Sequence, residues 1–125
     1  MIGYCTLGTN DLARAGKFYD ALFADIGGKR FMDTDRSIAW MSGPTSGGFG
    51  ICKPFDGKPA TVGNGVMVAI TVDSKAKVDA LYKKAMQLGG KDEGAPGPRG
   101  DSGFYAAYFR DLDGNKLNVF CMSGA

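Results

Sequence analysis

One absence limits the side chains that could carry out chemistry in this chain. The 125 residues contain no histidine, so the commonest general base near neutral pH and the commonest transition-metal ligand are both missing. Among the remaining groups we single out Tyr4, Arg99 and Lys116 for acid–base or anion-binding chemistry. Any reaction that uses them would depend on a phenol, a guanidinium or an ammonium group.

The thiols do not supply an obvious alternative. Cys5, Cys52 and Cys121 are odd in number and far apart, and no two of them form a CxxC motif. Such usage is typical of buried thiols in a reducing cytoplasm rather than of a disulfide framework or a zinc site. Strand alternation predicts that Cys5 and Cys121 are small buried hydrophobes, which leaves Cys52 as the thiol to test for reactivity. With no histidine to activate it, a catalytic cysteine is not expected.

The elements that must position these groups occur twice. A helix-like segment at 10–22 is followed by Gly27-Gly28-Lys29, and after about half the chain a similar segment at 73–82 is followed by Gly89-Gly90-Lys91. Neither copy is large enough to bury a core alone, so we expect the copies to pack against each other or against a second chain. The function is expected to lie between them.

Hydrophobic periodicity and turn residues predict the same order of elements in each copy. In the first copy we expect a strand at 2–7, a helix capped by Thr9 or Asn10, and strands at 30–32, 37–41 and 49–53. In the second we expect a strand at 66–72, a helix capped by Asp73 or Ser74, a stiff loop at 94–100, and strands at 104–110 and 116–122. The fold class is therefore α+β with paired βαβββ modules.

Composition restricts the classes of partner. We expect residues 1–125 to form a single domain, with module one at 1–57, a linker at 58–65 and module two at 66–122. A net charge of +2 without a basic run argues against nucleic acid. No apolar stretch reaches the length of a membrane span, and the N-terminus has no secretory pattern. The sequence therefore predicts a cytoplasmic protein without nucleic-acid or membrane partners.

Several short motifs resemble those of one family. Thr6-Leu7-Gly8, Phe18-Tyr19, Ala80-Leu81-Tyr82 and the run 110–115 (Arg-Asp-Leu-Asp-Gly-Asn) occur in order on the duplicated frame. Together they resemble the vicinal oxygen chelate, or glyoxalase/bleomycin-resistance/dioxygenase, superfamily, which usually has proline where Leu112 stands. The resemblance implies two tandem βαβββ modules forming a curved mixed sheet, with helices on the outer face and a concave cleft.

The resemblance also implies where a metal would bind. In metal-dependent members, histidine or glutamate side chains from the first and last strands of each copy converge on a divalent ion, which acts as a Lewis acid. The corresponding positions here are Tyr4, Met67, Asn118 and, within 49–52, Gly50. None is a carboxylate or an imidazole, so we expect no metal and no other cofactor.

Strand alternation indicates which side chains reach the cleft. Tyr4 and Thr6 share one face of their strand, as do Lys116, Asn118 and Phe120 of theirs. Tyr105 and Tyr108 are three residues apart, so only one of them reaches the cleft. Trp40, Phe49, Tyr105 and Phe120 either line an aromatic pocket or fill the core, and Arg99 either pairs with an anionic ligand or is a solvated loop charge. The candidate ligand-binding residues are Tyr4, Thr6, Trp40, Met67, Arg99, Tyr105, Asn118 and Phe120.

Three functions are consistent with this pattern. The first is metal-free binding of a small, partly aromatic, neutral or anionic molecule in the cleft. The second is a lyase, isomerase or dioxygenase, either metal-dependent through other ligands or metal-free through Tyr4, Lys116 or Arg99. The third is an interaction module that keeps the fold only for dimerisation. A homodimer is expected, since twofold dimers are the commonest oligomers.

Overall fold

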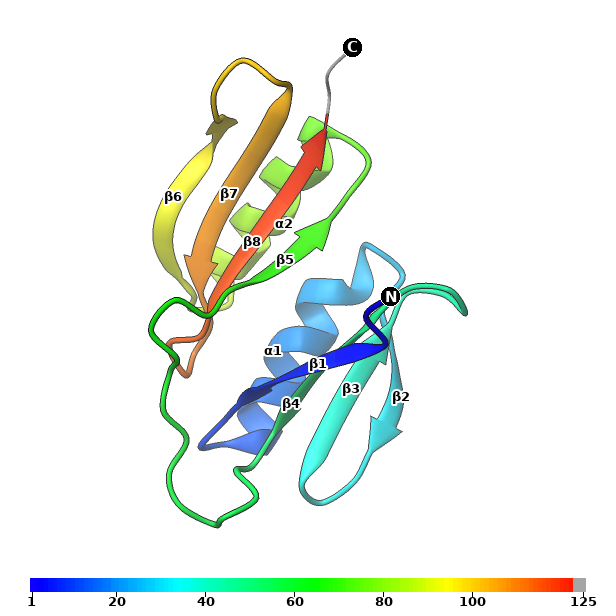
Figure 1. Cartoon of the computed structure of the whole chain (residues 1–125), viewed down its shortest axis with the longest axis vertical. Coiled ribbons are helices and arrows are strands. Elements are labelled where there is room, and N and C mark those ends of the chain that lie inside the picture. The colour runs from blue at the N-terminus through cyan, green and yellow to red at the C-terminus, as the bar shows by residue number, and fades with distance from the viewer. Residues whose placement is uncertain (123–125) are drawn as a thin grey trace. The chain divides into compact units, whose positions relative to one another are not determined.

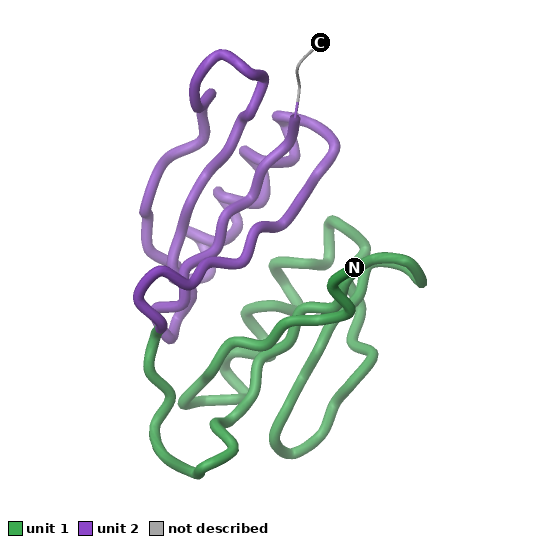
Figure 2. The backbone as a smooth tube through the Cα atoms, in the orientation of Figure 1, with its two compact units in different colours: residues 1–62 green, residues 63–125 purple. Residues whose placement is uncertain are grey.

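The chain consists of two compact units. A computed structural model describes residues 1–122; unit 1 ends at Val62 and unit 2 begins at Gly63, as Figure 2 shows in green and purple. The boundary falls inside the predicted linker at 58–65. Each unit therefore corresponds to one of the two predicted copies.

Unit 1 is a four-stranded mixed sheet with one helix. Its elements are β1 (Tyr4–Gly8), α1 (Leu12–Ala24), β2 (Lys29–Asp33), β3 (Ser37–Met41) and β4 (Gly48–Cys52). The strand order is β1-β4-β3-β2. β1 runs parallel to β4, and the other neighbours are antiparallel. In Figure 1, α1 lies behind this sheet.

Unit 2 repeats the same topology. Its elements are β5 (Val68–Thr71), α2 (Lys75–Gln87), β6 (Lys91–Pro98), β7 (Phe104–Arg110) and β8 (Lys116–Met122). The strand order is β5-β8-β7-β6, with β5 parallel to β8. Figure 1 shows α2 behind this second sheet. The predicted α+β class with a repeated βαβββ order is confirmed, and the mixed sheet consists of two four-stranded sheets, one in each unit.

Both helices begin at side chains that accept hydrogen bonds from the first turn. Ser74, one of the two residues predicted to cap α2, accepts a hydrogen bond from the Lys77 amide. Asp11 caps α1 by accepting from the Arg14 amide, so the expectation of Thr9 or Asn10 is wrong by one or two residues. Within residues 1–122, neither helix has the length and apolar content needed to cross a bilayer.

The stretch 94–100 is predicted as a loop, but most of it belongs to strand β6. β6 runs through Pro98, with register shifts between Asp92 and Gly94 and between Gly94 and Gly97. Because β6 is the outer strand of its sheet, only one side of it must supply hydrogen bonds, and prolines are tolerated there. Pairing with β7 therefore overrides the turn signal of the prolines and glycines.

An aromatic cluster forms the core of unit 1. The Trp40 ring lies 5.6 Å from that of Tyr19, 6.0 Å from that of Phe23 and 6.4 Å from that of Phe49. Only 2% of Trp40 is exposed, and its indole N–H donates to Asp20 Oδ1 at 2.8 Å. Trp40 therefore fills the core beneath α1, and its assignment to a ligand site is corrected. The reason is that β3 turns this side chain toward the helix, whose apolar face removes it from water.

Asp20 connects this core to strand β2. Its carboxylate accepts two hydrogen bonds from Arg30, at 2.9 Å from Nε and 2.7 Å from Nη2, in addition to the bond from Trp40. The hydrogen bond from Arg30, opposed by partial burial and supported by the bond from Trp40, holds the pKa of the Asp20 carboxyl below its ordinary value. This carboxylate therefore stabilises unit 1 in its ionised form.

We expect Asp20→Asn to lower the free energy of unfolding at pH 7 by about 1 kcal/mol, since the pair is partly exposed and screened by solvent. Because the folded-state pKa is depressed, this contribution is present above the unfolded-state pKa of about 4 and is lost as the pH falls through the lower folded value. Urea unfolding followed by the fluorescence of Trp40, the single tryptophan, measures it at pH 7 and at successively lower pH. Asp35→Asn, at an exposed position, is the control and should change little; a pH-independent difference for Asp20→Asn would contradict the prediction.

In unit 2, aliphatic residues of α2 pack on the facing strands. The helix contributes Val78, Leu81 and Ala85, and α2 contacts β6, β7 and β8. The sheet residues that are 0% exposed on this side are Ala107, Phe109, Leu117 and Val119. This packing leaves the opposite face of the sheet without a helix within the unit.

Candidate functional site

The helix-free face of unit 2 is identified by the alternation of β7. The Tyr105 hydroxyl donates to Asp79 of α2 at 2.7 Å, so Tyr105 lies on the helix side. Tyr108, three residues on, lies on the other side, directly opposite Asn118 of β8. Phe104 and Ala106 share that side with Tyr108 by the same alternation.

Tyr105 is therefore placed on the wrong face by the sequence prediction. Lys75 Nζ lies 5.6 Å from the centre of its ring, and the hydrogen bond to Asp79, followed by burial, raises the pKa of the Tyr105 phenol. Residue spacing shows that two tyrosines lie on opposite faces, but it does not show which face the helix covers. Of the two tyrosines, Tyr108 is the one that lies on the helix-free face.

Two cations stack on Tyr108. Arg99 Cζ and Lys116 Nζ each lie 5.5 Å from the centre of the Tyr108 ring. Among residues 1–122, no carboxylate lies within ion-pair distance of either cation. The nearby Glu93 carboxylate accepts a hydrogen bond from Arg110 instead. The surface around Tyr108 therefore carries two positive charges for which the described residues supply no carboxylate within ion-pair distance.

Arg99 is held in place by the strand that it follows. Its Nη1 donates to Gly97 O at 2.9 Å and its Nη2 donates to Ala95 O at 2.8 Å. Gly94 lies beneath this arrangement: a Cβ there would be 3.1 Å from Tyr108 Cδ2 and 3.3 Å from Arg99 Nη2. The glycine thus permits the close approach of β6, Tyr108 and Arg99, and the hydrogen bonds to the main chain hold the guanidinium group in place.

An aromatic pair lies farther along the same face. The rings of Phe104 and Phe120 are 5.4 Å apart and inclined by 30°. Asn118 lies between Phe120 and Lys116 on β8, is only 2% exposed, and its Nδ2 donates to Ala107 O at 3.0 Å. Asn118 therefore supports the sheet from within, while the two phenylalanines and Tyr108 form the aromatic surface.

The helix-free face of unit 1 carries two other predicted residues. Tyr4, which is 62% exposed, and Thr6 lie opposite Gly48 and Gly50 of β4. A Cβ at Gly48 would be 3.0 Å from Tyr4 Cβ and 3.0 Å from two ring carbons of Phe31. Glycine at this position thus leaves room for both Tyr4 and Phe31 over β4.

The positions at which the resemblance implies metal ligands do not fit a divalent cation. In unit 1 they hold the Tyr4 phenol and Gly50, and in unit 2 the Met67 thioether and the Asn118 amide, whose nitrogen already bonds to the main chain. In the part of the chain that the structure describes, no group of three or more Cys, Asp or Glu side chains could hold a metal ion. Thioether and neutral amide groups are a poor donor set for the hard or borderline ions of this chemistry.

None of the thiols gains a functional partner. Cys5, Cys52 and Cys121 are free, with Cys121 buried and the other two partly buried. Burial raises the pKa of the Cys5 thiol, which disfavours the reactive thiolate. The burial of Cys121 agrees with its predicted role as a small buried hydrophobe, whereas Cys5 is only partly buried, like Cys52.

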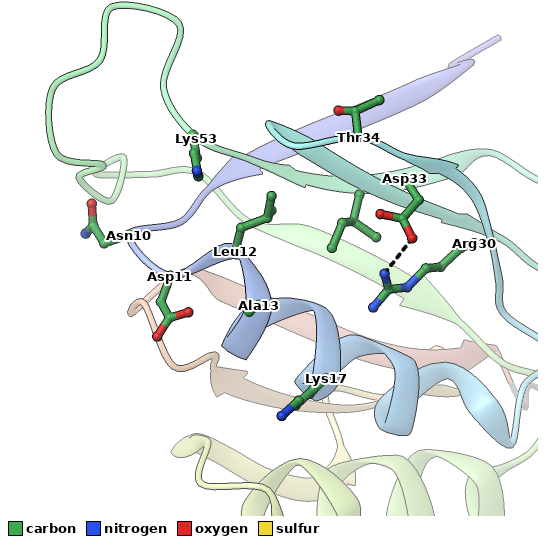
Figure 3. Close-up of a pocket in the computed structure, with 10 residues that line it drawn as sticks. Asn10, Asp11, Leu12, Ala13, Lys17, Arg30, Asp33, Thr34 and Lys53 are labelled. Carbon is green, nitrogen blue, oxygen red and sulfur yellow. Dashed lines mark hydrogen bonds and ion pairs between the residues drawn. The ribbon is translucent and has the colours of Figure 1, made fainter.

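An open pocket lies on the helix side of unit 1, between the start of α1, the β2–β3 turn and the segment after β4 (Figure 3). Three cations are among its lining residues, but Arg30 is paired with Asp20 and Asp33. Figure 3 shows Lys17 extending away from Lys53. The cations therefore do not converge on one point, and this pocket is the weaker candidate.

The structure thus separates the predicted residues into groups. Arg99, Asn118 and Phe120 belong to unit 2 and lie on or beneath its helix-free face, and Met67 immediately precedes β5 of the same unit. Tyr4 and Thr6 lie on the corresponding face of unit 1, and Trp40 and Tyr105 lie under the helices. Phe104 was not among the predicted residues, and Tyr108 was considered only as the alternative to Tyr105; both lie on the helix-free face of unit 2. The register of the hairpin across Asp113-Gly114 contains the signal, because it places Tyr108 opposite Asn118.

Comparison with known families gives a clear match. Residues 1–119 match the model of the glyoxalase/bleomycin resistance protein/dioxygenase superfamily. A comparison with curated proteins finds no match. The match covers both units and agrees with the motifs found in the sequence.

Solved structures share the fold over nearly the whole chain. A glyoxalase/bleomycin resistance protein from Albidiferax ferrireducens T118 is 35% identical, with 97% of this chain and 98% of that chain covered and a TM-score of 0.88. A lactoylglutathione lyase from Agrobacterium tumefaciens is 21% identical, with coverage of 97% and 92% and a TM-score of 0.72. A fosfomycin resistance protein from Listeria monocytogenes is 16% identical, with coverage of 97% and 92% and a TM-score of 0.73. The last two similarities concern the fold alone.

Proposed function

Because the chain belongs to the glyoxalase/bleomycin resistance protein/dioxygenase superfamily, we propose that it binds a small, partly aromatic anion on the helix-free face of unit 2, without a catalytic metal. The residues that would contact this anion are Arg99, Tyr108, Lys116 and Phe120. Asn118 would act from beneath them by fixing the sheet.

One observation carries this proposal: Arg99 and Lys116 both stack on Tyr108, and neither has a carboxylate partner within residues 1–122. A cation placed over an aromatic ring keeps its charge available on its outer side. Neighbouring positive charges without a counter-ion attract an anion. An aromatic ring in the ligand would find a matching surface in the Phe104–Phe120 pair.

The donor set supports the metal-free part of the proposal. The residues at the implied ligand positions are phenol, glycine, thioether and amide, which favour organic contacts over coordination of a divalent ion. Binding through charge and stacking needs no such ion. A homodimer and a cytoplasmic location remain part of this proposal, as expected from the sequence.

Calorimetric titration with two aromatic acids, 4-phenylbutyrate and 4-propylbenzoate, and with the primary amide of each, tests the proposal. We expect at least one acid to bind more tightly than its amide, because the amide lacks the negative charge. Lys116→Met keeps most of the length of the side chain but removes its charge, and should weaken binding of the acid about 10- to 100-fold, the range for a charge-assisted hydrogen bond.

Lys83→Met is the matched control, since Lys83 is an exposed lysine on α2. It causes the same change of net charge away from the site and should leave the affinity unaltered. Equal affinity for acid and amide, or equal losses in Lys116→Met and Lys83→Met, would contradict the proposal.

A further inference from the structure

Asn64 and Gly65 form an exposed turn in the segment that joins the two units. The amide of Val66 donates to Gly63 O at 3.2 Å, which closes a β-turn with Asn64 and Gly65 at its centre. Gly65 has a φ of +91°, and among residues 1–122 only glycines have a positive φ, so the turn is of type II. It begins directly after the boundary at residue 62, where the tube in Figure 2 changes colour.

The two central residues of this turn have few interactions. Within residues 1–122, neither the Asn64 side chain nor the Gly65 amide makes a hydrogen bond. Every residue from 61 to 67 is exposed, and a Cβ on Gly65 would meet no atom within 4 Å. The bond from Val66 is the interaction that closes the turn, so the main chain can open here at little cost.

The other three asparagines of the chain are held by hydrogen bonds. Asn10 bonds to the main chain of Ala60 through both side-chain atoms, with Oδ1 accepting at 2.7 Å and Nδ2 donating at 3.1 Å. The side-chain nitrogens of Asn115 and Asn118 each donate at 3.0 Å, and these residues are 6% and 2% exposed. Each of the three precedes a residue with a side chain, whereas Asn64 precedes a glycine.

We propose that Asn64 is a site of spontaneous modification, at which the side-chain amide becomes a carboxylate through a cyclic imide. The main-chain nitrogen of Gly65 loses its proton to hydroxide and attacks Cγ of Asn64. A C–N bond forms, and the side-chain nitrogen leaves as ammonia. Water then adds to one of the two ring carbonyls and breaks its bond to the imide nitrogen, which gives aspartate or isoaspartate. The net reaction consumes one water and releases one ammonia, without oxidation or reduction.

Ring closure has two requirements, and the turn meets both. In a type II turn the ψ of Asn64 is about +120°, which points the Gly65 nitrogen away from Cγ, so the main chain must rotate before the attack. The exposed turn, closed by one hydrogen bond, permits that rotation. The attacking nitrogen must also be accessible, and glycine has no Cβ to shield it.

The modification changes the segment between the units in two ways. A neutral amide is replaced by a carboxylate, so the net charge of +2 at pH 7 falls by one. In isoaspartate the main chain also passes through Cβ and Cγ, which inserts one additional carbon into the connection between the units. An aged sample is therefore expected to contain three forms that differ in the charge and length of this segment.

Incubation of the folded protein at neutral pH, followed by peptide mapping with mass spectrometry, tests the proposal. We expect the peptide that contains Asn64 to gain the mass difference between an amide and an acid, and to separate into aspartate and isoaspartate forms. The peptides that contain Asn115 or Asn118 should remain unchanged. Because the attacking nitrogen must lose its proton, the rate at Asn64 should rise in proportion to the hydroxide concentration.

Two references make the test sharp. In Gly65→Ala a methyl group shields the attacking nitrogen, and the rate should fall at least tenfold. A synthetic peptide of residues 60–67 gives the rate for a chain without a fold. The rate in the folded protein should lie within about tenfold of the peptide rate, since one hydrogen bond of ordinary strength can slow the reaction by no more than that.

Three outcomes would overturn the proposal. The first is a rate in the folded protein that lies further below the peptide rate, which would mean that the fold protects Asn64. The second is formation of aspartate without isoaspartate, which would exclude the cyclic imide. The third is a Gly65→Ala protein that reacts as fast as the original chain. Circular dichroism before and after incubation confirms that both proteins are folded.

Discussion

Replacing Phe109 by alanine is expected to lower the free energy of unfolding of unit 2 by about 3–5 kcal/mol. Phe109 is 0% exposed and lies on the helix-covered side of β7, opposite Leu117 of β8 in the register. Truncation removes the transfer free energy of a whole ring and leaves a cavity between α2 and the sheet, which the surrounding strands can fill only in part. Urea unfolding followed by far-UV circular dichroism measures the loss.

The matched control for this substitution is Phe55→Ala. Phe55 is 91% exposed, and its ring centre lies 5.2 Å from Cζ of the Arg36 guanidinium. Because little apolar area is buried there, the same chemical change should cost less than about 1 kcal/mol. Similar losses for the two variants would show that burial of Phe109 is not what stabilises unit 2.

Gly90→Ala is expected to destabilise the same unit by about 1–3 kcal/mol, through overpacking rather than through a cavity. A Cβ at Gly90 would lie 2.8 Å from Ala85 O and 2.9 Å from Arg110 O. Both atoms belong to the main chain, so neither can rotate away as the end of a side chain could. The end of α2 and the end of β7 would have to separate, and the midpoint of urea unfolding should fall accordingly.

Gly43→Ala provides the comparison, because a Cβ at Gly43 would meet no atom within 4 Å and Gly43 does not have a positive φ. Alanine there restricts the unfolded chain without a clash and should be neutral or stabilising by a few tenths of a kcal/mol. A Gly90→Ala protein as stable as Gly43→Ala would mean that the close approach of α2 and β7 is unnecessary.

Most of the fold could be predicted because hydrophobic periodicity and the residues that end each element indicate the same strands and helices. Alternation in 37–41, 104–110 and 116–122 agrees with β3, β7 and β8, and helical spacing followed by a glycine pair gives α1 and α2. The 94–100 stretch could not be predicted in this way. Its prolines and glycines favour turns locally, and only the position of β6 at the outer edge of the sheet makes a strand of them acceptable.

The candidate site was predictable in part. Of the eight residues that the sequence assigned to one ligand site, the structure places Arg99, Asn118 and Phe120 on or beneath the helix-free face of unit 2; that they bind a ligand stays a prediction. Trp40 and Tyr105 were assigned to the wrong face of their sheets. The sequence pattern around an aromatic residue in a strand is the same whether its side chain faces the helix or the opposite side. The helix that covers the sheet decides between the faces, and hydrogen bonds to Asp20 and Asp79 show the result.

The sequence by itself determined the duplicated βαβββ frame, the family and the lack of histidine and carboxylate at the implied ligand positions, since these depend on residue identity and short-range spacing. Only the tertiary structure decided which face of its sheet each helix covers and which charged side chains lie close together. Arg99 reaches Tyr108 because β6 pairs with β7 and Gly94 allows a close approach, and Lys116 reaches the same ring through the neighbouring strand. Such convergence depends on contacts between strands far apart in the chain, which no local pattern of residues specifies.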